Sequence, residues 1–172
     1  AEVILITGPT SQQIQHSFIN RINVTTALEM HEAVHKEYAH VDIAILSAAV
    51  ADYKPKNVAT QKIKKAANSL EIQLEPTKDI LASLGTAKKK QFLVGFALET
   101  NNEIENAKDK LQRKNLDMIV LNSLQDKGAG FAKNTNKVTI IDADLNETPF
   151  ELKSKSDVAN DIINHILKKI NA

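Results

Sequence analysis

Short runs of branched apolar residues alternate along the chain with segments whose apolar residues recur every three or four positions. Continuous apolar runs are typical of strands buried on both faces, and the longer period is typical of helices that pack on a sheet. The runs predict strands at residues 3–7, 19–24, 43–50, 70–74, 92–96, 118–121 and 138–142. The periodic segments predict helices at residues 26–38, 103–115 and 156–170.

This alternation predicts an α/β fold with a Rossmann-like, doubly wound and mostly parallel sheet. In such a sheet, ligands bind in the crevice beyond the carboxyl ends of the strands. One connection does not fit. Only eleven residues, 8–18, separate the first two predicted strands, and they carry no helical stripe. Because a parallel crossover usually takes a dozen or more residues including its helix, a βα unit is expected to be missing there.

Length and composition agree with a single globular domain. The chain has 172 residues, 42% of them hydrophobic and 25% charged, and one domain takes roughly 150 residues. The longest apolar stretch, near residues 43–51, is too short for a membrane helix, and the first residues do not resemble a signal peptide. There is no cysteine for a disulfide or a thiolate site. We therefore expect a cytoplasmic protein that does not contact a membrane.

Net charge limits the class of partner. The total is +1, which argues against a chain built to coat nucleic acid. Residues 53–70, however, contain five lysines and no acidic residue, a local charge of +5. Such a cluster would attract a compact polyanion such as a triphosphate, and the alternative is a solvated lysine loop. RNA binding is disfavoured because Tyr53 is the single aromatic residue of the stretch.

Two strand ends carry candidate ligand contacts. Gly8 follows the first strand between two threonines, where backbone N–H groups can face an anion, although an ordinary turn would look the same. The third strand ends in the mostly small residues 47–51, and Asp52 follows them. A flat ligand could lie against this backbone with Asp52 at its rim, but small residues also permit close helix packing.

His31 and His35 match the H-E-x-x-H pattern of zinc peptidases, in which two histidines one helical turn apart bind the metal. The buried stripe of this helix passes through Met30 and Val34, so the two imidazoles are expected to turn toward solvent. We therefore predict no metal site at this motif.

Several segments together resemble the phosphopantothenoylcysteine synthetase family of coenzyme A biosynthesis, a domain that bacteria often fuse behind a flavin-dependent decarboxylase. The segments that carry the resemblance are residues 48–53, 62–65, 94–97 with 99–100, and 110–117. The likeness extends over nearly the whole chain from Ile22 onward, and it includes the first strand and its Thr-Gly-Pro-Thr loop.

The resemblance implies CTP-dependent ligation of 4′-phosphopantothenate to L-cysteine through an acyl-cytidylate, with release of pyrophosphate and then CMP. It also implies Mg²⁺ as cofactor, a homodimer, and a fused or associated flavin-dependent decarboxylase. Two alternatives stay open, namely the same ligation with ATP and a nucleotide-binding module without turnover.

Site residues follow from the resemblance by position. Lys62 is expected to be catalytic, because it would place positive charge at the phosphates. The implied nucleotide contacts are Gly8, Ser47, Ala48, Asp52, Lys62, Thr77, Lys78, Asp79, Ile80, Phe96, Lys110 and Lys114. The alignment at residues 77–80 is loose, because the sequence there differs from the Asn-Pro-Asp usual in the family.

The chain also departs from the family near its first loop. An Asn-x-Ser-Ser-Gly stretch that opens a helix is expected there, and its asparagine is linked to turnover of the acyl-nucleotide. We hypothesise that a few tens of residues are absent between about residues 14 and 18 of a single synthetase domain spanning 1–172. A real deletion would favour the module without turnover.

Overall fold

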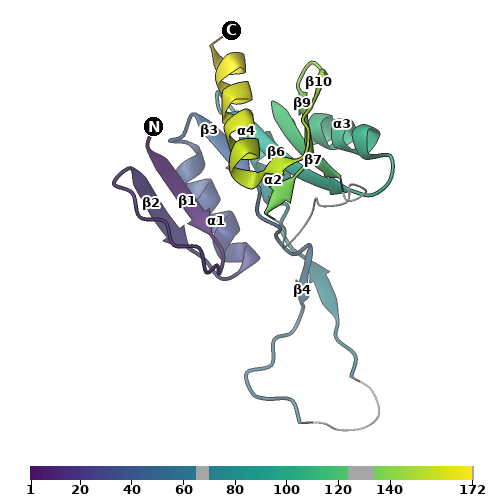
Figure 1. Cartoon of the computed structure of the whole chain (residues 1–172). Helices are drawn as coiled ribbons and strands as arrows, with labels where there is room; N and C mark the ends of the chain where they lie inside the picture. The colour runs from purple at the N-terminus through teal and green to yellow at the C-terminus, as the bar shows by residue number, and fades with distance from the viewer. Residues whose placement is uncertain (65–69, 124–133, 172) are drawn as a thin grey trace. The chain divides into compact units, whose positions relative to one another are not determined.

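The computed structural model describes residues 1–64, 70–123 and 134–171 (Figure 1). These residues form two compact units. The first comprises residues 1–37 and 48–80, and the second comprises residues 38–47 and 81–172. Each unit is described by itself below, and the single domain expected from chain length stays a prediction.

The first unit contains two parallel strands joined without a helix. β1 (Val3–Thr7) pairs in parallel with β2 (Ile19–Asn23), and α1 (Ala27–Tyr38) follows. The Val3 amide donates to the Phe18 carbonyl at 2.8 Å, so the connection from β1 returns to the amino end of β1, where β2 begins. Eleven residues are therefore enough here, and connection length alone does not require a missing segment. The hypothesis of a deletion stays a prediction.

A short hairpin completes this unit. β4 (Tyr53–Pro55) and β5 (Leu74–Pro76) are antiparallel, and the described residues between them, 56–64 and 70–73, form no helix or strand (Figure 1). The prediction of a sheet strand at residues 70–74 is wrong. Leu70, Ile72 and Leu74 alternate as in a strand, but they are 64%, 62% and 58% exposed and cover no core.

The second unit is a five-stranded sheet in the order β10-β9-β7-β6-β3. The strands β3 (Ile43–Leu46), β6 (Phe92–Glu99) and β7 (Met118–Ser123) are parallel. The strands β9 (Val138–Asp142) and β10 (Glu147–Pro149) add an antiparallel edge, and β8 (Thr135–Asn136) pairs with β11 (Lys153–Ser154). The predicted α/β class with a mostly parallel sheet is confirmed.

Helices cover both faces of this sheet. α4 (Lys155–Ile170) buries Val158, Ile162 and Ile166 against residues of β6, β7 and β9 (Figure 1). α2 (Ile80–Ala87) and α3 (Glu103–Arg113) belong to the opposite face, where α3 contacts β6 and β7. The pattern did not predict α2, because its three large apolar residues, Ile80, Leu81 and Leu84, span little more than one turn and make too short a stripe.

Among the helices of the described residues, none has both the length and the apolar character needed to cross a membrane.

Candidate functional site

A cavity of about 380 Å³ opens in the first unit, where β1 and β2 end and α1 begins. Small and apolar side chains make most of its wall. The lining residues are Thr7, Gly8, Pro9, Val24, Thr25, Thr26, Ala27, Met30, Ala48, Ala49, Val50 and Ala51. Two predicted contacts, Gly8 and Ala48, therefore lie in one cavity. A Cβ at Gly8 would meet no atom within 4 Å, so space beside this backbone is open.

The start of α1 is closed by a reciprocal pair of side-chain caps. Thr26 Oγ1 accepts from the Glu29 amide at 3.1 Å, and Glu29 Oε2 accepts from the Thr25 and Thr26 amides at 2.6 and 3.0 Å. The hydrogen bonds from Thr25 and Thr26 lower the pKa of Glu29. An anionic ligand would have to displace this carboxylate before it could use those two N–H groups.

Two predicted contact segments meet at the base of the hairpin. The Thr77 amide donates to the Asp52 carbonyl at 2.8 Å, and Thr77 Oγ1 donates to the Ala51 carbonyl at 2.6 Å. The backbone that follows the cavity wall is thereby tied to the segment of Lys78, Asp79 and Ile80. The segment at residues 77–80 therefore begins beside Asp52, and its role in nucleotide binding stays a prediction.

His31 and His35 stack one turn apart on α1, with ring centroids separated by 4.3 Å. Both side chains are half-buried, and His31 Nδ1 is buried without a hydrogen-bond partner in the described structure. The prediction that both rings turn to solvent is therefore wrong for His31. Burial, and then the neighbouring His35 and Lys78, lower the pKa of His31. No group of three potential metal ligands occurs in the described ranges.

The described part of the lysine-rich stretch begins in β4 and continues into the residues that follow this strand. Lys54 forms an ion pair with Glu75 at 3.1 Å, which reduces the local excess of positive charge. Lys56, Lys62 and Lys64 are exposed, and Lys65 lies outside the described residues. Lys62 does not line the cavity, so the structure does not test its predicted contact with phosphates.

In the second unit, Phe96 and Lys110 are brought together at an open position on β6. The register of β3 on β6 ends at Leu46 and Gly95, and Ser47 follows directly. The Phe92 amide bonds to the Asp42 carbonyl beside β3, so the backbone of Phe96, four residues on, points to the same side. Its carbonyl accepts from Lys110 Nζ at 3.0 Å. This predicted pair is therefore adjacent.

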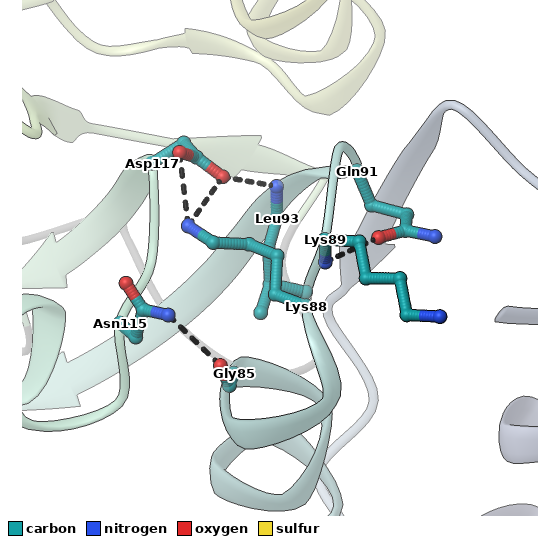
Figure 2. A network of polar contacts seen from close by, with 7 residues as sticks. All are labelled: Gly85, Lys88, Lys89, Gln91, Leu93, Asn115 and Asp117. Carbon is teal, nitrogen blue, oxygen red and sulfur yellow. Dashed lines mark hydrogen bonds and ion pairs between the residues drawn. The ribbon is translucent and has the colours of Figure 1, made fainter. Parts of the chain in front are cut away.

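Lys114 lies one turn beyond Lys110, and its amide donates to the Lys110 carbonyl at 3.1 Å. The residues after it are structural (Figure 2). Asn115 has a positive φ of 52° and donates from Nδ2 to the Gly85 carbonyl at 2.9 Å. Asp117 Oδ2 accepts from the Leu93 amide at 2.7 Å, and Lys88 Nζ lies 3.0 Å from both of its carboxylate oxygens.

Gly95 has a packing role. A Cβ on it would lie 2.7 Å from Leu81 Cδ2 and 2.8 Å from Leu116 Cδ1. Leu81 of α2 and Leu116, which follows α3, therefore pack on the sheet directly over this glycine. Residues 94–97 carry part of the family resemblance, and only Phe96 among them is an expected nucleotide contact. Gly95 packs in the core, and Phe96 is half-buried.

Comparisons with known proteins extend over the whole described chain. A family model described as DNA/pantothenate metabolism flavoprotein C-terminal domain matches residues 1–170. A cysteine/cysteine sulfinic acid decarboxylase from an unidentified prokaryotic organism is 55% identical over 168 residues, 97% of this chain and 47% of that protein. The coenzyme A biosynthesis bifunctional protein CoaBC of Bacillus subtilis (strain 168) is 44% identical over 166 residues, 96% of this chain and 41% of that protein.

Solved structures show the same fold. The crystal structure of the C-terminal domain of CoaBC is similar with a TM-score of 0.81 and 38% identity, over 99% of this chain and 75% of that one. The DNA/pantothenate metabolism flavoprotein from Streptococcus pneumoniae has a TM-score of 0.78 at 18% identity, over 98% of this chain and 81% of that one, and it supports the fold alone. The chain spans less than half the length of the two relatives named above.

Proposed function

Because this chain belongs to the DNA/pantothenate metabolism flavoprotein C-terminal domain family, we propose that it ligates 4′-phosphopantothenate to L-cysteine at the expense of CTP. The observation that carries the proposal is the match to the C-terminal domain of CoaBC over 99% of the chain at 38% identity. The resemblance found in the sequence is confirmed by this membership. The activity, the nucleotide and the partners are proposals, as are a homodimer, a cytoplasmic location and a flavin-dependent decarboxylase partner.

In the proposed reaction, a carboxylate oxygen of 4′-phosphopantothenate attacks the α-phosphorus of CTP. The α–β phosphoanhydride bond breaks, and pyrophosphate leaves with the bonding electrons. The amine of cysteine then attacks the acyl carbon, the amide forms, CMP leaves, and the ammonium proton passes to solvent. Both anionic partners of the first step need fixed positive charge nearby, because their mutual repulsion rises as they approach.

The residues of this chain take the following roles in the proposal. Lys62, Lys110 and Lys114 neutralise phosphate charge, and Lys62 acts in the first step. Lys110 would exchange the Phe96 carbonyl, which it now contacts at 3.0 Å, for a phosphate oxygen. The ring of Phe96 stacks on the base, and Asp52 binds the ribose.

Gly8, Ser47, Ala48 and the segment at residues 77–80 would complete the nucleotide contacts. The Asp52 carbonyl accepts from the Thr77 amide, and Asp79 follows two residues later along the chain. Mg²⁺ is usually held in such sites by one or two carboxylates together with substrate phosphates, and Asp52 and Asp79 are the carboxylates that would hold it. When bound, Mg²⁺ supplies further charge neutralisation on the triphosphate.

The test is pyrophosphate release by the full chain with 4′-phosphopantothenate, Mg²⁺ and either CTP or ATP, with and without cysteine. We expect cysteine-dependent release with CTP, and we expect Lys62→Ala to lower kcat by about 10²–10³-fold. Lys36→Ala, on the exposed side of α1, is the matched control and keeps the wild-type rate. A preference for ATP contradicts the nucleotide assignment. CTP binding without pyrophosphate release supports a module without turnover.

A further inference from the structure

The carboxyl end of β7 holds a polar side chain that has no partner among the described residues. Asn122 lies one residue before the end of this strand, and its Oδ1 is buried with no hydrogen-bond donor in the described part of the chain. A buried acceptor left unpaired destabilises the folded protein, so its presence requires an explanation. Three other such atoms, in His31, Tyr38 and His165, lie on helices. Asn122 lies at the sheet edge where α/β folds bind ligands.

The register of the sheet places Asn122 near Phe96. Met118 and Val120 of β7 pack in the core under α4, and alternation along the strand puts Asn122 on the same face. Phe96 of β6 packs against the same core cluster and is paired in register with Val120. Asn122, paired with Leu98, is therefore the diagonal neighbour of Phe96 toward the carboxyl end.

This inference rests on the proposed use of a nucleotide whose base stacks on Phe96. We propose that Asn122 Oδ1 accepts a hydrogen bond from the exocyclic amino group of that base and so selects cytosine over uracil. The amino group lies in the plane of the ring, so a base stacked on Phe96 can direct it sideways to Asn122 on the neighbouring strand. Uracil carries a carbonyl oxygen at the same position, and two acceptors would then face each other.

The test compares CTP with UTP in the pyrophosphate-release assay, using the full chain. Wild-type protein is expected to have a kcat/KM about tenfold or more higher for CTP than for UTP. Asn122→Leu removes the acceptor at similar size and is expected to bring this ratio close to one, chiefly by raising the KM for CTP. Asn122→Asp keeps an acceptor and is expected to preserve the ratio.

Asn160→Leu, the same chemical change at an exposed position of α4, is the matched control and keeps the wild-type ratio. The inference is overturned if wild-type protein does not discriminate between CTP and UTP, or if Asn122→Leu lowers the rate with both nucleotides equally. If wild-type protein binds CTP but releases no pyrophosphate, the ligase proposal fails separately. The same CTP-to-UTP ratio, measured as Kd by calorimetry, then decides the role of Asn122.

Discussion

Gly85 in α2 permits a close contact that fixes the end of α3. A Cβ at this position would overlap the carbonyl oxygen of Lys114 and lie 2.9 Å from the carbonyl carbon of that residue. Carbon atoms in contact normally lie about 3.5–4.0 Å apart, and backbone atoms cannot move aside as a side chain would. We therefore predict that Gly85→Ala destabilises the second unit, although alanine is the better helix former.

The magnitude follows from three contributions. Overpacking a filled site costs about 1–3 kcal/mol, and a clash with backbone belongs near the upper end of that range. If α2 moves away from Asn115 to relieve the clash, the 2.9 Å bond from Asn115 to the Gly85 carbonyl is lost, which costs about 1 kcal/mol. The gain in helix propensity offsets about 1 kcal/mol. The net loss is about 3 kcal/mol, which corresponds to about 6–12 °C in Tm for a chain of this size.

The assay is urea unfolding followed by circular dichroism at 222 nm, with Gly8→Ala as the matched control. The same substitution at Gly8 meets no atom within 4 Å and is expected to change stability by less than about 0.5 kcal/mol. If the two units unfold in separate transitions, only the one that contains α2 should shift. A Gly85→Ala protein as stable as wild type would refute the reasoning.

Two further predictions concern individual polar contacts. Asp142 is 4% exposed; its burial by itself raises its pKa, but the bonds from Lys169 and Asn146 together lower it. Because folding lowers the pKa of Asp142, its contacts contribute stability above the unfolded pKa of about 4, and this contribution is lost as the pH falls through the folded pKa. In Asp142→Asn, the urea midpoint should therefore be lower than that of wild type at pH 7, and it should change less between pH 7 and pH 3. Thr26→Ala removes the Oγ1 cap of α1 and should cost about 1 kcal/mol in urea unfolding, whereas exposed Thr60→Ala should cost nothing measurable.

Much of the second unit could be predicted from apolar pattern alone. The strand predicted at residues 138–142 and the helix predicted at residues 156–170 agree with the structure within one residue. In both, the pattern and the burial coincide, because Val138, Ile140 and Ile166 are fully enclosed. The resemblance to a known family predicts that Phe96 and Lys110 contact the same nucleotide, and in the structure these two residues contact each other.

The pattern failed where local sequence does not decide the partner of a segment. Strand β3 ends at Leu46, although apolar residues continue to Val50, because the small residues after it line the cavity instead of extending the sheet. Asn122 gave no signal, since a lone asparagine at the end of an apolar run resembles any strand terminus. Its interest comes from burial without a partner, which only the structure records.

The segment at residues 110–117 shows why a shared motif cannot be assigned wholly to ligand contact. Lys110 reaches the open edge of β6 and Lys114 lies one turn further on, whereas Asn115 and Asp117 hold the end of α3 against α2 and β6. The contacts of Asn115 and Asp117 fix the position of the end of α3 and so of the two lysines. A substitution at Asn115 or Asp117 would therefore displace the lysines without touching a ligand. Asn115→Gly tolerates the positive φ of 52° and removes only the side-chain bond, so it isolates this positioning effect. If the Asn115 side-chain bond positions Lys114, this variant should raise the KM for CTP while leaving the KM for cysteine unchanged.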